Sequence, residues 1–370
     1  MHPAIDTVYP GVSTEFCPSS GSQHILACGT YKLVEQEPEQ LTPSSEGDVS
    51  SGRSKQTRLG RCTMFRVNIG GDGEDTLDKI QDVDLPGILD MKWCDRTEGL
   101  SPLLGIADAE GSITLHEWKE DEARYSTTWV YSIQLGRPDV LCLSLDWSNR
   151  RWPSSCSALG SLVVSLSDGT LSILRPDSST GLIPSDSWSA HEFEPWIAAW
   201  DYWDPNVVYS GGDDVKLKGW DIRQGLDNPT FVYKRFDAGV TAIQSHPYIE
   251  HLFAAGSYDS TVRIFDTRNP SRPLEETNVG GGVWRVKWHP LASRKDDLLV
   301  ACMHDGFKVL HSNTSTDGKV EVESASIAKR YDEHESLAYG VDWSCAPAKE
   351  SGTLIASCSF YDHSLHLWRG

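Results

Sequence analysis

Two histidines of this 370-residue chain stand directly beside an acidic residue, in segments that predict turns. His304 precedes Asp305, His363 follows Asp362, and Cys302 lies two residues before His304. A histidine can take up a proton near neutral pH, and a nearby carboxylate can orient its ring. Cys302 could instead be a nucleophile, although it occupies a position where small residues usually pack. These residues could therefore perform proton transfer or covalent catalysis.

A second group combines aromatic rings with charge. Trp196, Trp284, Arg285 and Tyr339 stand in loops that lead into predicted strands, and Asp213 is an additional acid in a neighbouring turn. If those loops meet on one face, they form a concave, aromatic and acidic mouth. The alternative is that the tryptophans only pack between structural units. The sequence contains no Gly-x-Ser-x-Gly, His-Glu-x-x-His or Walker motif, and no cluster with metal-ligand spacing, so we expect neither a metal nor a cofactor.

Self-similar units must position these residues. Each unit ends a first strand on an aromatic or equivalent residue and has an acid in the turn before a later strand. The anchors are 54, 56, 42, 43 and 55 residues apart: Trp93, Trp147, Trp203, Ser245, Trp288 and Trp343. A period of about 40–45 residues is typical of WD40 repeats. With a weaker unit between residues 15 and 67, the sequence predicts an all-β, seven-bladed WD40 β-propeller.

The two ends of the chain are predicted to share one blade. The last unit stops after its third strand, so we expect residues 5–9 to supply the outer strand and close the ring. Residues 1–370 would then form a single domain. Residues 34–58 are rich in Glu, Ser, Pro, Gly and Gln, which predicts a disordered loop inside the first blade.

Two His/Ser/Asp sets that resemble catalytic triads are better explained as structural hydrogen-bond networks. WD40 blades can join a His, a Ser or Thr, an Asp and a Trp in one chain of hydrogen bonds, because buried polar groups need partners. The matching sets are His191, Ser210, Asp214 and Trp220, and His334, Ser357, Asp362 and Trp368.

Composition excludes several classes of protein. Fifty-three acidic residues against 33 basic ones give a formal charge of −20, which repels nucleic acid and anionic membranes. No apolar run reaches the ~18 residues that a membrane span requires, and the N-terminus lacks a signal pattern. We expect a cytoplasmic protein, and a monomer because a closed ring exposes no sheet edges.

Three stretches are more specific than generic WD40 patterns: GGVWRVKWHP at 281–290, ACMHDGFK at 301–308 and CSFYDHSLHLW at 358–368. With these, the chain resembles the WD-repeat family of diphthine methyl ester hydrolases, also called diphthine methyltransferases, of diphthamide biosynthesis. The resemblance covers nearly the whole chain except residues 34–58. It implies hydrolysis of the methyl ester on a modified histidine of translation elongation factor 2, with release of methanol.

The implied substrate carries a trimethylammonium group beside its ester. Aromatic faces bind quaternary ammonium groups, so Trp196, Trp284 and Tyr339 are the candidate cage, and Asp213 adds acidic attraction.

The family provides no catalytic triad that transfers residue by residue, so the catalytic roles rest on physical argument. We expect His304 to act as general base on water, oriented by Asp305 or Asp362, with Arg285 near the developing oxyanion. His363 is the reserve base, and direct attack by Cys302 is the competing mechanism.

The alternative function is a non-catalytic WD40 platform. The segments 220–223 (WDIR) and 265–268 (FDTR) match or nearly match a Trp-Asp-x-Arg pattern by which some WD proteins dock onto cullin ubiquitin-ligase adaptors. In that case the protein would be a ubiquitin-ligase substrate receptor.

Overall fold

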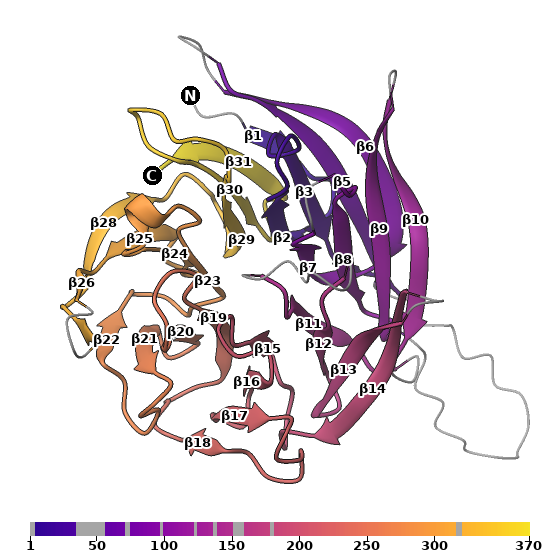
Figure 1. Ribbon diagram of the computed structural model, residues 1–370. Coiled ribbons are helices and arrows are strands. Elements are labelled where there is room, and N and C mark those ends of the chain that lie inside the picture. The colour runs from indigo at the N-terminus through magenta and orange to yellow at the C-terminus, as the bar shows by residue number, and fades with distance from the viewer. Residues whose placement is uncertain are drawn as a thin grey trace, which may run out of the picture.

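Seven antiparallel sheets stand around a central channel like the blades of a propeller (Figure 1). The computed structural model describes residues 4–34, 56–70, 75–96, 99–121, 124–135, 139–150, 159–177, 181–315 and 320–370. Within these residues the only helix is a 3-10 turn, η1 (Ala292–Arg294). None of the helical structure in these ranges is long and apolar enough to cross a membrane. The predicted all-β, seven-bladed fold is confirmed.

The blades follow one another along the chain, and the first strand of each is innermost. Blades 1 to 3 contain β2 (Gly11–Phe16), β3 (Ile25–Thr30), β4 (Lys32–Leu33), β5 (Arg58–Asn68) and β6 (Thr76–Pro86); β7 (Ile88–Cys94), β8 (Leu103–Asp108), β9 (Ser112–Asp121) and β10 (Arg124–Gln134); β11 (Cys142–Trp147), β12 (Leu162–Leu166), β13 (Thr170–Asp177) and β14 (Gly181–Ser189).

Blades 4 to 7 complete the ring. They contain β15 (Ile197–Trp200), β16 (Val207–Gly211), β17 (Leu217–Asp221) and β18 (Phe231–Tyr233); β19 (Val240–Ser245), β20 (Leu252–Ser257), β21 (Thr261–Asp266) and β22 (Glu275–Asn278); β23 (Arg285–Trp288), β24 (Asp297–Ala301), β25 (Phe307–His311) and β28 (Ser326–Tyr331); β29 (Ala338–Trp343), β30 (Leu354–Ser359), β31 (Ser364–Arg369) and β1 (Ala4–Asp6). Two further short strands, β26 (Thr314–Ser315) and β27 (Glu321–Val322), pair with each other.

The N-terminal strand closes the ring, as predicted. Ile5 of β1 pairs with Leu365 of β31 in antiparallel register. The strand ends at Asp6 instead of reaching Tyr9, because the Asp6 carboxylate accepts a hydrogen bond from the Val8 N–H and Val8 has a positive φ of 69°. Both ends of the described chain therefore lie in blade 7 (Figure 1).

The repeated tryptophans tie neighbouring blades together. The indole N–H of Trp93 donates to the Glu15 carbonyl of the preceding blade at 3.1 Å, and that of Trp147 donates to the Lys92 carbonyl at 3.0 Å. Trp203 departs from this pattern, because it lies three residues beyond the end of β15. The predicted anchor in blade 4 is therefore wrong, although the blade itself forms as expected.

The predicted loop at residues 34–58 falls largely on residues 35–55, which lie outside the described residues. Its two ends are described: Leu33 of β4 pairs with Arg58 of β5, so the segment leaves and re-enters blade 1 between paired strands.

Candidate functional site

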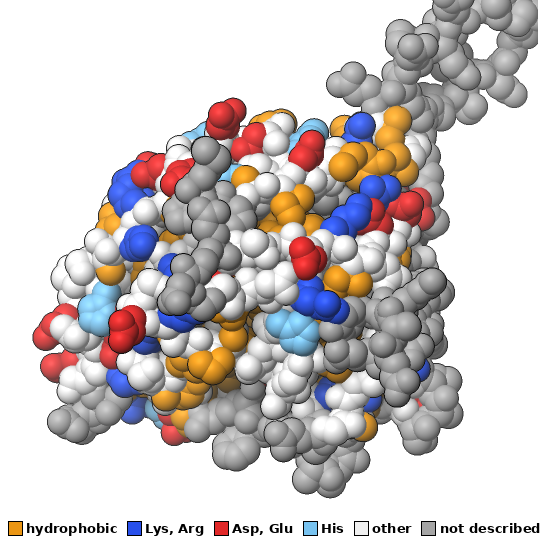
Figure 2. Space-filling model, turned by 90° about the horizontal axis from the view of Figure 1, so that it is seen from above, with side chains coloured by type: hydrophobic (Ala, Val, Ile, Leu, Met, Phe, Trp, Pro, Cys, Tyr) orange, Lys and Arg blue, Asp and Glu red, His pale blue; other side chains and the backbone are white. Residues whose placement is uncertain are grey.

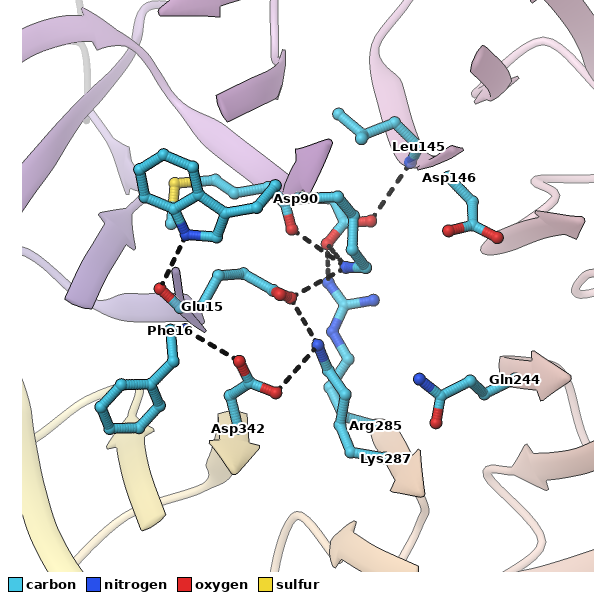
Figure 3. Close-up of polar contacts among 12 residues, drawn as sticks. Glu15, Phe16, Asp90, Leu145, Asp146, Gln244, Arg285, Lys287 and Asp342 are labelled. Atoms are coloured by element: carbon cyan, nitrogen blue, oxygen red, sulfur yellow. Dashed lines mark hydrogen bonds and ion pairs between the residues drawn. The ribbon is translucent and has the colours of Figure 1, made fainter. Parts of the chain in front are cut away.

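Charged side chains from the innermost strands line the central channel. Side chains two residues apart on a strand point in the same direction, so one strand can deliver two charges to the channel. Asp90 and Lys92 come from β7, and Arg285 and Lys287 come from β23 on another side of the ring. Figure 3 shows Asp90, Arg285 and Lys287 directed toward one another.

These charges form one buried set of ion pairs. The Lys287 ammonium lies 2.6 Å from the Glu15 carboxylate, and the Arg285 guanidinium lies 2.9 Å from the Asp90 carboxylate. The complete set is Glu15, Asp90, Lys92, Arg285, Lys287 and Asp342. Burial strengthens each attraction because little water screens it.

The channel perturbs its acids in opposite directions. Burial by itself would raise the pKa of Asp90, but Arg285 and Lys92 outweigh it and hold this pKa below its usual range. Burial raises the pKa of Asp342 to about 6; Lys287 opposes this shift, and Glu15 adds to it.

Arg285 does not have the position expected of an oxyanion-stabilising group beside His304. Its side chain is 9% exposed and is committed to Asp90, which is 195 positions away in the sequence. Its guanidinium also lies 5.9 Å from the centroid of the Trp284 ring, so Arg285 connects the channel with the aromatic loops at the channel mouth.

The three predicted cage residues meet at that mouth. The ring centroids of Trp196 and Trp284 are 5.9 Å apart, and those of Trp284 and Tyr339 are 4.6 Å apart. Tyr258 lies 6.1 Å from Trp284, and Phe360 lies 5.0 Å from Tyr339. We call this continuous surface the aromatic track: Trp196, Tyr258, Trp284, Tyr339, Phe360 and Tyr361.

The two tryptophans of the track differ in their polar contacts, and Trp284 also packs against the core between blades 6 and 7. The Trp196 indole N–H donates to the Asp213 carboxylate at 2.7 Å, and Asp213 is exposed at this face. The Trp284 indole N–H is buried and has no hydrogen-bond partner among the described residues. Because the rings touch one another, the track is a surface rather than an open cage.

His304 lies in a shallow groove at the far end of the track. The groove is also lined by Tyr361, whose ring lies 5.0 Å from that of Phe360. The preceding residue, Met303, accepts a backbone hydrogen bond from Ala338 in the blade 7 strand that carries Tyr339. His304 itself is exposed to solvent.

The expected orientation of His304 by Asp305 does not occur. The Asp305 carboxylate accepts hydrogen bonds from Lys308 and from Arg330, the latter at 2.8 Å. These two cations lower the pKa of Asp305, and burial opposes them. Arg330 lines the groove together with His304, so it is the cation that this groove offers.

Asp362 also has other partners. Its carboxylate accepts hydrogen bonds from the Ser359 and Ser364 hydroxyls and from the Glu335 N–H, so it does not serve to orient His304. The backbone carbonyl of the adjacent His363 accepts a hydrogen bond from the Thr7 N–H at 2.7 Å. This turn therefore holds the N-terminal segment in place.

Both predicted networks form, the second in altered form. In blade 4, the His191 ring bonds Asp214 at 2.8 Å and Ser210 at 2.7 Å, and Trp220 donates to Ser210 at 2.9 Å. In blade 7, His334 and Trp368 both bond Ser357, whereas Ser359 stands between His334 and Asp362. Burial lowers the pKa of His334 to about 3, and His366 adds to the shift.

Cys302 is buried, with its side chain in the core between blades 5 and 6. Burial raises the pKa of its thiol to about 12, although Lys308 partly opposes the shift. A thiol that remains protonated at neutral pH is a poor nucleophile. Its surroundings therefore support the packing role over direct attack.

The excess negative charge does not gather on the edge of the ring seen in Figure 2, where acidic and basic side chains are interspersed. Across the part of the chain that the structure describes, no group of three or more His, Cys, Asp or Glu side chains could hold a metal ion.

Comparison with solved structures gives the class of protein. A chain in the crystal structure of the mitotic checkpoint complex superposes with a TM-score of 0.62 at 14% sequence identity, over 99% of this chain and 93% of that one. At this identity the likeness concerns the fold alone. The architecture and the hydrogen-bond networks define the molecule as a WD40 β-propeller.

The family is shown by sequence. No family model matches the chain. Human diphthine methyltransferase is 40% identical over 92% of this chain and 74% of its own length. A Dictyostelium discoideum diphthine methyltransferase homolog is 33% identical over 97% and 96%, and the Schizosaccharomyces pombe enzyme is 31% identical over 94% and 91%. The chain belongs to the diphthine methyltransferase family.

Proposed function

We propose that this protein acts in diphthamide biosynthesis by hydrolysing the methyl ester of methylated diphthine on translation elongation factor 2, in the cytoplasm. Family membership supports the pathway. The observation that carries the proposal is the aromatic track, in which Trp196, Trp284 and Tyr339 from three different blades meet on one face.

The track suits the cationic part of this substrate. A quaternary ammonium group gains about 0.5–2 kcal/mol from an aromatic face, depending on how far it is desolvated. Asp213 supplies negative charge at the Trp196 end of the track. A trimethylammonium group bound on the Tyr361 end of the track would leave the neighbouring ester free to approach the groove that contains His304.

Hydrolysis then requires a base and a cation. In the proposed reaction, His304 takes a proton from water as the water oxygen attacks the ester carbonyl. Arg330 stabilises the negative charge on the carbonyl oxygen; it pairs with Asp305 and Asp332, but it lines the groove and its side chain is 45% exposed, whereas that of Arg285 is 9% exposed. The bond between the carbonyl carbon and the methoxy oxygen breaks, and the methoxy group takes the proton back from His304. The products are methanol and the carboxyl group of diphthine.

The direct test is to incubate the purified protein with elongation factor 2 that carries methylated diphthine. We expect the factor to lose the mass of one methylene group in mass spectrometry, with release of methanol. Binding without any change in mass would overturn hydrolysis and favour the platform alternative. Both arginines of that alternative form ion pairs within the chain: Arg223 lies 2.8 Å from Asp204 and from Asp221, and Arg268 lies 2.7 Å from Asp266.

Replacing Trp284 should weaken substrate binding. Trp284 contacts the rings on both sides of it, so Trp284→Ala interrupts the track, and loss of one cation–π contact should raise KM by about 2- to 30-fold. Demethylation rates at several substrate concentrations measure this effect. Phe193→Ala is the matched control, because Phe193 is 58% exposed and outside the track. An unchanged KM for Trp284→Ala would remove the track from substrate recognition.

A further inference from the structure

A cavity of about 450 Å3 lies at the opposite end of the channel from the aromatic track. Its lining includes Phe16, Trp288 and Trp343, which are the last residues of β2, β23 and β29. Trp284 of the track, in contrast, directly precedes β23. The two surfaces are therefore separated by the length of the innermost strands, and the proposed reaction does not use this cavity.

Two opposite charges face this cavity without pairing with each other. Arg150 follows β11, and Asp95 follows β7. The Arg150 side chain is 17% exposed, and its Nε atom is buried without a hydrogen-bond acceptor in the described ranges; the nearest acid, Asp146, lies 3.5 Å away. The Asp95 carboxylate has no hydrogen bond or ion pair to any residue that the structure describes.

A buried charge without close partners is costly. Arg150 has one ion pair, to Asp146 at 3.5 Å, its buried Nε has no hydrogen-bond acceptor among the described residues, and Asp95 has no close cation, so this wall has room for a further charged partner. The other charged groups that line the cavity pair with one another at short distances. Lys287 lies 2.6 Å from Glu15 and 3.3 Å from Asp342. Burial raises the pKa of Asp95 to about 6, with Arg150 opposing and Asp146 adding to the shift, as expected for a carboxylate without a close cation.

The chemistry of the walls specifies the ligand. A guanidinium with free donors prefers a carboxylate, and a free carboxylate prefers a cationic nitrogen. Tyr248, whose side chain is 39% exposed, lines the same cavity and offers a ring to N-methyl groups, while Trp93, Tyr202 and Trp343 are buried in its wall. The volume is that of a site for a small molecule. We propose that the cavity binds a small zwitterion of the betaine class, with its carboxylate on Arg150 and its quaternary ammonium near Asp95.

Two sources could supply this chemistry. One is a free betaine, and the other is the product side chain of the proposed reaction, which carries a trimethylammonium group beside a carboxylate. Only the second source rests on the proposed function.

Isothermal titration calorimetry with glycine betaine tests the site. We expect the wild-type protein to bind glycine betaine more tightly than choline, which lacks the carboxylate, or acetate, which lacks the cation. Arg150→Gln and Asp95→Asn should each weaken betaine binding by about tenfold or more, because each removes a charge-assisted contact. Arg223→Gln is the matched control, since that arginine is 54% exposed on the surface. Equal thermal unfolding midpoints would show that the variants remain folded.

Wild-type protein that binds betaine no better than choline and acetate would overturn the proposal, as would unchanged betaine binding by folded Arg150→Gln. Displacement of betaine by diphthine-bearing elongation factor 2, but not by the unmodified factor, would identify the product side chain as the ligand. Lack of displacement would assign the cavity to a free betaine. If betaine binds but the demethylation assay shows no product, the result would reject the proposed hydrolysis and still support the betaine-binding site.

Discussion

His304→Ala is expected to lower kcat for demethylation by about 10²- to 10⁴-fold, the usual contribution of a general base. His304 is exposed in the groove where the aromatic track ends, and Arg330 lines the same groove. It is therefore accessible both to water and to an ester whose ammonium group lies on the track. Mass spectrometry of the modified factor at saturating substrate measures kcat directly.

Two variants control for the other candidate groups. His363→Ala should retain kcat, because the turn that contains His363 serves to hold the N-terminal segment. Cys302→Ala should also retain it, since the buried Cys302 thiol has a pKa of about 12. Full activity in folded His304→Ala, with loss in His363→Ala, would transfer the role of base to His363. Loss of activity only in Cys302→Ala would restore the covalent mechanism.

Asp90→Ala is expected to lower the free energy of unfolding by about 3–5 kcal/mol, the cost of removing one partner from a buried ion pair. Asp90 is completely buried and accepts from both Arg285 and Lys92. Without the Asp90 carboxylate, Arg285 and Lys92 remain buried in the channel with one fewer negative charge to pair with. Urea denaturation followed by tryptophan fluorescence measures the difference.

Asp84→Ala is the matched control, because Asp84 pairs with Arg61 but its side chain is 75% exposed. An exposed pair contributes about 0–1 kcal/mol, so this variant should be close to the wild type. Equal decreases in the free energy of unfolding for Asp90→Ala and Asp84→Ala would show that water screens the ion pairs of the channel as it screens surface pairs.

The same substitution should change the acid dependence of stability. The pKa of Asp90 is lower in the folded state than in the unfolded chain. Its contribution is therefore present above the unfolded pKa of about 4 and is lost as the pH falls toward the folded value. Below pH 4, the free energy of unfolding should decrease less steeply for Asp90→Ala than for the wild type. If the free energies of unfolding of the variant and the wild type decreased in parallel below pH 4, the result would contradict a lowered pKa for Asp90 in the folded state.

The sequence predicted the fold because the blades repeat local signals. Trp93, Trp147, Trp288 and Trp343 mark equivalent positions, and strand alternation identifies their surroundings. Trp203 was a misleading anchor, since spacing alone cannot distinguish a strand residue from one three positions beyond the strand.

The site was only partly predictable. Trp196, Trp284 and Tyr339 each lie four positions before the last residue of an innermost strand, so the repeat brings them together. Tyr258 and Phe360 were missed, although each directly follows the second strand of its blade, a repeated position that could have identified them. Arg285 and Asp90 belong to different blades and are 195 positions apart in the sequence, so no local sequence pattern encodes their pairing.

Ring closure by β1 also sets an order of events during synthesis. Thr7 and its hydrogen-bond partner His363 are 356 positions apart, so the N-terminal strand leaves the ribosome long before its partner exists. Blades 1 to 6 are each built from consecutive strands and can form as these emerge, whereas blade 7 must wait for β31. Until β31 emerges, β1 has no partner strand in blade 7, and its pairing with β31 closes the ring.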